Sequence, residues 1–393
     1  MRIAVLRERR SGERRVAISP EMVKKYRALN VEVAVEQGAG LGASIPDSEF
    51  EAAGARIAGS AAEALEGATV LLKVQRPIAG GDDEAQAGGD EMALLHSGLT
   101  LLGVLNPMQH RDQVQAYAQA GVNAFAMEFM PRITRAQSMD VLSSQSNLAG
   151  YKAVLDASAE FGRAFPMMMT AAGTVAPAKV FVMGAGVAGL QAIATARRLG
   201  AIVSATDVRP ATKEQVESLG AKFVMVEDEE SAAAETAAGY AKEMSEAYRQ
   251  KQAALVAEHI RKMDIVITTA LIPGRPAPRL VSQEMVESMK PGSVLVDLAV
   301  ESGGNVALSR PGEVVEHNGV RIVGHRNVPS RVAVDASQLY ARNLYNFLSP
   351  HIDKESGAIR LDPADETVSG TQLTRDGAVV HPSLADAPAT GGQ

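Results

Sequence analysis

Short runs of apolar and β-branched residues recur along the chain, and a polar–apolar stretch of helical length follows most of them. Because no tight hairpin signal separates the runs, this alternation predicts βαβ units and mostly parallel sheets, an α/β fold. In the first third of the chain the runs predict strands at residues 2–8, 31–37, 69–74, 100–105 and 123–128. Helical spacing predicts helices at residues 19–29, 47–54 and 110–120, with Ser19 and Asp47 as N-caps.

A second series of apolar runs predicts one complete doubly wound sheet. A long helix is expected before it at residues 143–165, and a helix at residues 335–348 is expected to return to the first domain. The six strands of this sheet are expected at residues 179–184, 201–207, 222–227, 264–270, 293–299 and 320–324.

The stretches between these elements differ in character. Residues 77–91 are glycine-rich and acidic, which predicts a surface loop. Met167–Met169 are expected to fill the core at the start of the second domain. The first half of residues 227–262 is small and acidic and predicts a mobile loop with Gly239 as a hinge, whereas the second half predicts an amphipathic helix. Short runs in the tail from about Lys354 leave open whether it packs on a neighbouring subunit.

The length of 393 residues exceeds one hydrophobic core, which favours two domains. We expect two Rossmann-like domains with parallel doubly wound sheets, separated by a cleft. The first domain would hold residues 1–145 plus about 330–393, and the second would hold residues 146–329.

Composition excludes several classes of function. The net charge of −7 argues against nucleic acid as a partner, because phosphate backbones require a basic face. Cysteine is absent, so disulfides and thiolate-bound metals are excluded, and a reducing cytoplasm is expected. No apolar run is long enough to span a membrane, and the N-terminus does not have the pattern of a signal peptide. The histidines are scattered without ligand spacing, so no metal site is expected.

The motif with the most specific chemistry is G-x-G-x-x-G at Gly184, Gly186 and Gly189, which follows a predicted strand and opens a predicted helix. Such glycines allow a tight turn, close approach of a pyrophosphate and close helix–strand packing. Asp207 ends the next predicted strand, where a carboxylate accepts hydrogen bonds from the adenosine ribose and favours NAD(H) over NADP(H). Arg209 either softens this preference or lies on the surface. The neighbouring cofactor-binding candidates are Val187, Ala188 and Val208.

A further predicted strand ends at Thr268, Thr269 and Ala270, at the edge of the sheet where open α/β folds bind ligands. Thr269, Ala270 and the following Leu271 are therefore candidates to line the pyrophosphate or nicotinamide end. Asp297 and Glu301 are interpreted as a strand end and a loop charge rather than as paired catalytic acids.

Residues 132–151, RITRAQSMDVLSSQSNLAGY, collect amides, hydroxyls and charges too densely for a core. A capped, solvated helix start is one interpretation of this stretch. Together with RRVAISP, the glycine motif, ITTALIPGRPAP and GHRNVPSRVAVDAS, however, it resembles the NAD(H)-binding component of proton-translocating NAD(P)⁺ transhydrogenases. The resemblance runs along nearly the whole sequence, and a more distant one extends to alanine dehydrogenases.

The resemblance implies roles for particular residues. Arg132, Gln137, Asp140 and Ser143 would hold the carboxamide and ribose of the nicotinamide half in the cleft and would be the catalytic residues, with Gln137 also near the second nucleotide. Tyr151 would be a nearby positioning residue, and Tyr240 would lie at the tip of a loop that closes over the nucleotide.

The resemblance also implies an activity and partners. The chain would be a homodimeric, cytoplasmic subunit that binds NAD(H) and passes hydride to NADP⁺ on a separate NADP(H)-binding subunit. Membrane-spanning proton-channel subunits would couple this transfer to proton translocation and would hold the chain at the inner membrane.

Two alternatives remain open. An alanine-type amino-acid dehydrogenase needs a proton-transferring group beside its substrate. By resemblance, alanine dehydrogenases carry a lysine where this chain has Gln75 and a histidine where it has Asn106, which argues against that activity. Lys73 and Arg15 remain from the dehydrogenase pattern and are interpreted as structural. A non-catalytic NAD sensor would bind NADH without exchanging hydride.

Overall fold

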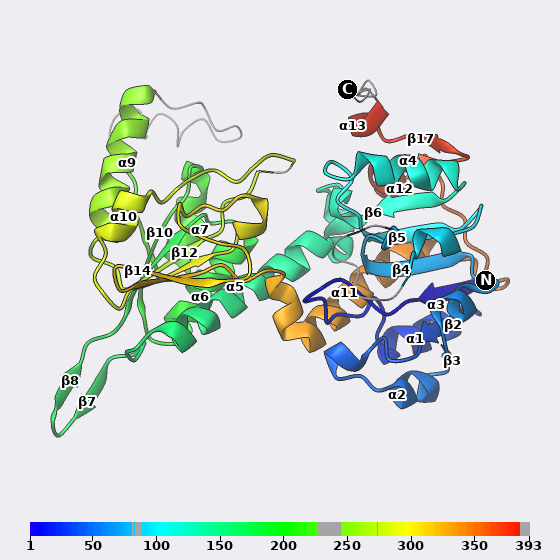
Figure 1. The fold of residues 1–393 in the computed structure, drawn as a ribbon, viewed down its shortest axis with the longest axis horizontal. Helices are drawn as coiled ribbons and strands as arrows, with labels where there is room; N and C mark the ends of the chain where they lie inside the picture. The colour runs from blue at the N-terminus through cyan, green and yellow to red at the C-terminus, as the bar shows by residue number, and fades with distance from the viewer. Residues whose placement is uncertain (81, 83–88, 227–244, 273, 386–393) are drawn as a thin grey trace. The chain divides into compact units, whose positions relative to one another are not determined.

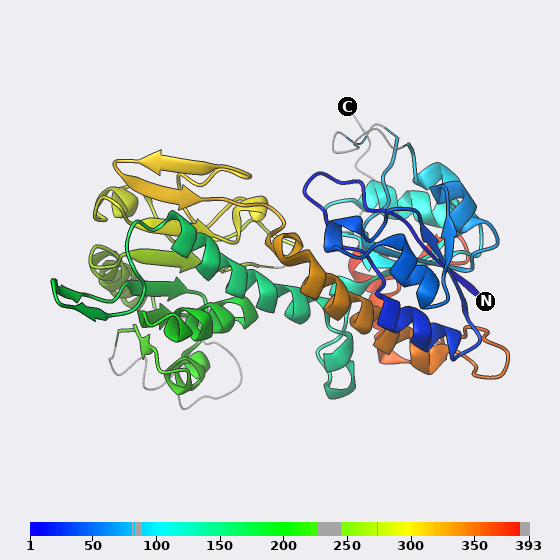
Figure 2. The same cartoon turned by 90° about the horizontal axis from the view of Figure 1, so that it is seen from below.

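The computed structural model describes residues 1–80, 82, 89–226, 245–272 and 274–385. The chain divides into two compact units, one of Met1–Gln145 with Ser330–Gln393 and one of Ser146–Pro329. Each unit is built around its own parallel sheet with helices on it, so the expected α/β fold with two Rossmann-like domains is confirmed (Figures 1 and 2).

The sheet of the first unit has the strand order β3-β2-β1-β4-β5-β6, which is the order of a doubly wound Rossmann sheet. All of its neighbouring strands pair in parallel. The five predicted strands form, and a short sixth strand, β3, was not predicted. The strands are β1 Arg2–Val5, β2 Glu32–Glu36, β3 Arg56–Ala58, β4 Val70–Gln75, β5 Thr100–Val104 and β6 Asn123–Ala126.

The helices of the first unit begin at local capping signals. Ser19 caps α1 (Pro20–Arg27) by accepting a hydrogen bond from the backbone N–H of Met22, as predicted. The prediction for Asp47 is wrong, because Pro46 occupies the N-cap of α2 (Asp47–Ala52) and the Asp47 carboxylate accepts from the N–H of Gly38. The remaining α-helices between the strands are α3 Ala61–Leu65 and α4 Arg111–Gln119.

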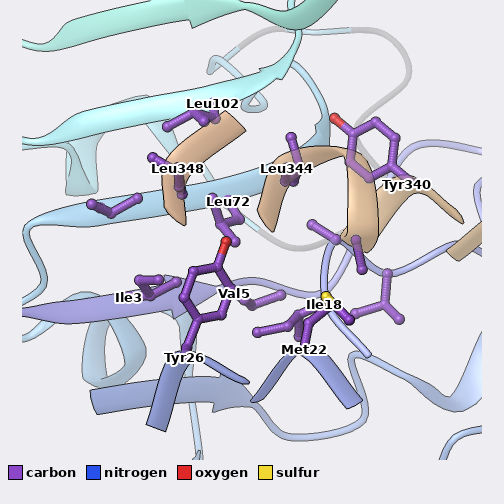
Figure 3. Close-up of a cluster of buried hydrophobic side chains, with 14 of the residues drawn as sticks. Ile3, Val5, Ile18, Met22, Tyr26, Leu72, Leu102, Tyr340, Leu344 and Leu348 are labelled. Carbon is purple, nitrogen blue, oxygen red and sulfur yellow. The ribbon is translucent and has the colours of Figure 1, made fainter. Parts of the chain in front are cut away.

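The core of the first unit brings together chain segments that are far apart in sequence. Helix α11 (Ala333–Leu348) returns to this unit and inserts Tyr340, Leu344 and Leu348 against the sheet (Figure 3). The Tyr340 hydroxyl donates to the carbonyl of Lys73 at 2.8 Å. The buried side chains that Figure 3 labels on the other elements are Ile3, Val5, Ile18, Met22, Tyr26, Leu72 and Leu102.

The tail packs on the first unit of the same chain. Gln372 forms an antiparallel bridge with Phe125 of β6, and the N–H of Leu373 donates to the carbonyl of Ala124. The tail therefore covers the edge strand of the sheet, which protects that edge from pairing with another chain. Its elements are α12 Glu366–Thr371, β16 Thr374–Arg375, β17 Ala378–Val379 and α13 Pro382–Ala385.

The sheet of the second unit has the order β11-β10-β9-β12-β13-β15-β14. The six predicted strands form in parallel, although β11 is shorter than expected, and an unpredicted edge strand, β14, pairs antiparallel with β15. The strands are β9 Lys179–Met183, β10 Ile202–Thr206, β11 Lys222–Phe223, β12 Ile265–Thr268, β13 Val294–Asp297, β14 Val314–His317 and β15 Val320–Val323. The helices are α5 Val141–Glu160, which begins in the first unit, α6 Val187–Arg198, α7 Lys213–Ser218, α9 Glu246–Ile260 and α10 Gln283–Glu287.

Met167–Met169 do not fill the core, so that prediction is wrong. They enter an antiparallel hairpin of β7 (Met168–Thr170) and β8 (Gly173–Val175), which extends away from the sheet of its unit (Figures 1 and 2). Their exposed fractions are 60%, 42% and 78%. No helix within the described residues has the length and apolar character needed to cross a membrane.

Candidate functional site

The glycine motif lies at the carboxyl end of β9, next to the ends of β10 and β12. β9 ends at Met183 and α6 begins at Val187, so Gly184, Ala185 and Gly186 form the turn between them. Gly184 has a φ of +105°, a conformation that suits glycine. Gly186, the N-cap of α6, makes no side-chain capping bond, which leaves the first backbone N–H groups of the helix available to an anion.

Two other glycines allow close packing around this turn. A Cβ on Gly189 would lie 1.8 Å from the carbonyl oxygen of Gly184, so only glycine fits there. A Cβ on Gly150 of α5 would lie 2.0 Å from the carbonyl oxygen of Ala188. A Cβ on Gly186, in contrast, would meet no atom of the described chain within 4 Å. Gly189 and Gly150 therefore serve packing, whereas Gly186 leaves room at the turn.

Asp207 lies directly after β10 and contacts the glycine turn. Its carboxylate accepts from the N–H of Ala185 at 2.7 Å, and from the backbone N–H and the side-chain Nε of Arg209 at 2.9 Å each. Burial raises the pKa of Asp207, but the hydrogen bonds from Arg209 and Ala185 outweigh it, so the pKa lies below its ordinary value. The carboxylate is therefore ionised and aimed at the turn, and Arg209 is its ion-pair partner.

The loop after β12 supports the turn from the other side. The Thr269 hydroxyl donates to the carbonyl of Gly184 at 3.0 Å. The fully buried Asn305 holds Ala270, with its side-chain oxygen accepting from the Ala270 N–H and its amide donating to the Ala270 carbonyl. Sequence reasoning missed this role of Asn305, although an amide after the Ser-Gly-Gly turn was the available signal.

Asp297 and Glu301 have structural partners, as interpreted from the sequence. Asp297 accepts from the Thr268 hydroxyl and from the N–H groups of Ala299 and Val306. Glu301 accepts from the N–H of Asn327.

Exposed apolar side chains surround the polar turn. Val208 is 84% exposed, and Val187, Leu271 and Ile272 are also largely exposed. They follow the carboxyl ends of β10, β9 and β12, which is the edge where open α/β sheets bind ligands. A surface with free N–H donors, an acid and apolar side chains has the chemistry that a dinucleotide requires.

The polar segment of the first unit forms a 3₁₀-helix, η4 (Thr134–Met139), followed by the start of α5. The Asp140 carboxylate accepts from the backbone N–H of Ser143 at 2.9 Å and from the Ser143 hydroxyl, so these residues cap the helix. The side chains of Arg132 and Gln137 are exposed. The structure thus places Arg132, Gln137, Asp140 and Ser143 in one short segment of the first unit.

The other proposed cofactor residues lie together in the second unit, at the ends of β9, β10 and β12. Tyr151 lies on α5 and is 38% exposed. Tyr240 and Gly239 lie outside the described residues.

The residues shared with the dehydrogenase pattern form buried ion pairs. Lys73 is 1% exposed, with its Nζ 3.3 Å from Glu8 and 3.1 Å from Glu91. The Arg15 guanidinium pairs with Glu13 at 2.7 Å, and the Gln75 amide donates to the same carboxylate. This agrees with the structural interpretation of Lys73 and Arg15. It also corrects the prediction for residues 77–91, because Glu91 at their end is buried beside Lys73.

Two buried carboxyls in this unit were not found from the sequence. Burial raises the pKa of Glu8 from 4.5 to about 7, an effect that Lys73 only partly offsets. Burial likewise raises the pKa of Glu128 to about 7, although the backbone N–H groups of Leu105 and Asn106 donate to it. Both groups hold a proton in the folded state in a pH range where the unfolded chain has released it.

We expect the stability of the protein to fall as the pH rises from about 4.5 to about 7, because the folded state must retain or give up these protons at a cost. Glu8→Gln cannot ionise, while its amide oxygen can still accept from the N–H of Val74. The loss of stability between pH 5 and pH 8 should therefore be smaller in the variant, by roughly 2–3 kcal/mol. Urea unfolding at both pH values measures this difference.

Glu51→Gln, at an exposed position on α2, is the matched control and should keep the wild-type pH dependence. An unchanged pH dependence in Glu8→Gln would contradict the assignment of the titrating proton to Glu8.

Two Rossmann-like domains, with a glycine turn beside an acidic strand end in the second, define the class of two-domain α/β dehydrogenase folds. The chain belongs to the alanine dehydrogenase/PNT family: the sequence model of its N-terminal domain matches residues 4–149, and that of its C-terminal domain matches residues 153–382. This confirms the resemblance drawn from the sequence.

Individual relatives place the chain within this family. It is 62% identical to the first of the split alpha subunits of the NAD(P) transhydrogenase of Rhodospirillum rubrum, over 98% of this chain and 99% of that one. The solved structure of a transhydrogenase from Sinorhizobium meliloti superposes with a TM-score of 0.86 at 57% identity, over 97% of this chain and all of that one. An alanine dehydrogenase of Mycobacterium tuberculosis is 32% identical, over 79% of this chain and 76% of its own length, and is the more distant relative.

Proposed function

We propose that this chain is the NAD(H)-binding component of a proton-translocating NAD(P)⁺ transhydrogenase, and that it passes hydride between NADH and NADP⁺ held on a partner subunit. The observation that carries this proposal is the turn of Gly184–Gly186 with Asp207 bonded against it. The high identity with transhydrogenase alpha subunits over nearly the whole chain supports the same function.

The second unit fits the adenosine and pyrophosphate parts of NAD(H). The open space at Gly186 and the first N–H groups of α6 suit the pyrophosphate, and Val187, Ala188 and Gly189 form that first turn. Asp207 would accept hydrogen bonds from the ribose hydroxyls and would repel a 2′-phosphate, so NAD(H) is favoured over NADP(H).

Further residues would complete this half of the site. Val208 offers an exposed apolar surface for the adenine. Arg209 would have to share or release Asp207 when the ribose binds. Thr269, Ala270 and Leu271 would line the side of the site nearest β12. We also assign Tyr240 to a loop that closes over the bound nucleotide.

The first unit fits the nicotinamide half. Exposed Arg132 and Gln137 can donate and accept hydrogen bonds at the carboxamide, and Asp140 with Ser143 can contact the ribose. When bound, the nicotinamide supplies or accepts hydride at its C4 atom. The four residues would orient the ring and exclude water, and no proton has to move for a transfer between two nicotinamides.

The structure also favours this function over that of an amino-acid dehydrogenase. Gln75, at the position that resembles the dehydrogenase lysine, is held by Glu13, and neither Gln75 nor Asn106 can exchange a proton near neutral pH. Lys73 is enclosed between Glu8 and Glu91 and is therefore not available to a substrate.

We propose partners and a location on the basis of the same likeness. The chain would act as a homodimer in the cytoplasm, at the inner membrane, where an NADP(H)-binding subunit and membrane-spanning proton-channel subunits would hold it. The names of its relatives, as alpha subunits, support an assembly with other subunits.

Two measurements test the proposal. Fluorescence titration should show NADH binding at least tenfold tighter than NADPH binding, because of Asp207. Mixed with an NADP(H)-binding subunit, the chain should transfer hydride from NADPH to an NAD⁺ analogue whose reduced form has its own absorbance. NADH binding without exchange would favour an NAD sensor, and reductive amination of pyruvate by the chain alone would favour an alanine-type dehydrogenase.

A further inference from the structure

The proposed nicotinamide segment has a conformation that its own backbone does not stabilise well. η4 runs for six residues, Thr134–Met139, whereas 3₁₀-helices longer than three or four residues are uncommon because their hydrogen bonds are poorly aligned. No side chain caps its N-terminus, and only Ala136 and Met139 of its residues are buried. The shape of the segment therefore depends on contacts with other parts of the first unit.

Helix α11 provides the first of these contacts. The side-chain amides of Asn343 and Asn346 both donate to the carbonyl of Ser138, at 2.8 Å and 3.0 Å. The Ser144 hydroxyl donates to the side-chain oxygen of Asn343 at 2.7 Å, which links the same helix to the first turn of α5. The C-terminal end of η4 is thus attached to α11.

The tail provides the second contact. The Arg135 guanidinium donates to both carboxylate oxygens of Asp365, at 2.9 Å and 2.6 Å, in the two-point geometry that fixes orientation as well as distance. Asp365 is in turn the N-cap of α12 and accepts from the backbone N–H and the hydroxyl of Thr367, which is fully buried. The carboxylate that holds Arg135 is therefore itself fixed in place.

The tail also follows the start of the segment. A Cβ on Gly370 would lie 3.3 Å from Cδ of Pro131, so the two backbones are close there. The His381 ring stacks on Phe129 with 4.8 Å between ring centroids, and its Nε2 lies 3.2 Å from the carbonyl of Gly370. The tail consequently contacts residues before the segment as well as Arg135 within it.

We propose that Asp365 is a positioning residue for hydride transfer: through Arg135 it fixes the orientation of the segment that carries Arg132, Gln137 and Asp140. This inference rests on the function proposed above. The pair is partly exposed, with side-chain exposures of 50% for Arg135 and 21% for Asp365, and such pairs contribute little to global stability. Its effect is expected on geometry, because a displacement of about 1 Å at reacting groups can cost a hundredfold in rate.

The test compares Asp365→Asn, Arg135→Gln and the double variant in the complex with the NADP(H)-binding subunit. Asparagine can still cap α12, and Arg135→Gln leaves that cap intact. Each single variant should exchange hydride roughly three- to tenfold more slowly, with the Kd for NADH changed by less than about twofold. Because the two side chains act as one pair, the double variant should be no slower than the slower single variant.

The control is Arg56→Gln, which removes a comparable exposed ion pair with Glu63. That pair lies beside β3, at the edge of the sheet opposite β6, and its loss should leave exchange unchanged. Thermal unfolding checks the fold of each variant, and if Asp365→Asn unfolds early, Arg135→Gln alone decides the question.

Wild-type exchange rates in both single variants would overturn the positioning role. So would a double variant whose loss is the product of the two single losses, since the residues would then act separately. If the wild-type chain exchanges no hydride at all, the proposed function fails first, and this inference fails with it.

Discussion

Gly186→Ala and Gly189→Ala should both weaken NADH binding, but only Gly189→Ala should destabilise the protein. The added methyl group at Gly189 would lie 1.8 Å from the carbonyl oxygen of Gly184. That oxygen belongs to the backbone and already accepts the Thr269 hydroxyl, so the turn itself must move. We expect a loss of about 1–3 kcal/mol in the free energy of unfolding, as for other overpacked sites.

At Gly186 the methyl group would meet no atom within 4 Å in the described part of the chain. The free energy of unfolding should therefore stay within about 0.5 kcal/mol of the wild-type value. If the pyrophosphate approaches the backbone there, the methyl group takes its place, and we expect the Kd for NADH to rise at least tenfold, or about 1.4 kcal/mol.

Urea unfolding and NADH titration of both variants separate these effects. Gly162→Ala, at another position where a Cβ would meet no described atom, is the control and should leave both measurements unchanged. Unchanged NADH affinity in Gly186→Ala would place the pyrophosphate elsewhere and would remove the main support for the cofactor site.

The sequence predicted the parts of the fold whose signals are local. Parallel strands buried on both faces are continuous apolar runs, so residues 179–183 and 265–268 could be recognised without knowing their neighbours. The glycine motif was recognisable for the same reason, because its spacing is set by one turn and the first turn of one helix.

The missed elements have weak or ambiguous local signals. β3 is three residues long and β14 alternates exposed and half-buried residues at the edge of its sheet, so neither produces an apolar run. The Met167–Met169 run misleads because hydrophobicity alone does not distinguish a buried strand from an exposed hairpin. Asp47 has the side chain of an N-cap, but the helix boundary is set one residue earlier, at Pro46.

The missed parts of the candidate site depend on contacts between distant residues. Lys73 pairs with Glu8 and Glu91, and Asp365 pairs with Arg135, 230 residues away in the sequence. Asn305 holds Ala270 from 35 residues further along the chain. Nothing in the residues near each position specifies such partners, whereas the residue types in the Arg132–Ser143 segment already indicated a polar binding surface.

Gln137→Asn should slow hydride transfer much more than it weakens NADH binding. The substitution keeps the amide but withdraws it by one methylene group, so its hydrogen-bonding groups would no longer reach the same atoms. Gln137 is exposed in η4, so the shorter side chain leaves no cavity in the core. We expect the fold to be unaffected and any loss of function to come from the orientation of the nicotinamide.

The expected size of this loss follows from how the two processes depend on position. Most contacts with the dinucleotide would be made by the turn at Gly184–Gly186 and by Asp207, so the Kd for NADH should change by less than about threefold. Transfer between two C4 atoms depends on their separation and alignment, and a displacement of about 1 Å should cost roughly ten- to a hundredfold in rate. A slower step at nearly unchanged affinity is the signature of an interaction that matters mainly in the transition state.

Single-turnover exchange in the presence of the NADP(H)-binding subunit measures this rate, and equilibrium titration measures the affinity. Gln115→Asn, at an exposed position on α4, is the matched control and should behave like the wild type. If Gln137→Asn lowered the affinity and the rate by the same factor, Gln137 would be a general binding contact. If it changed neither, the nicotinamide would have to be oriented by other residues, because a side chain in contact with the ring cannot be shortened without moving what it holds.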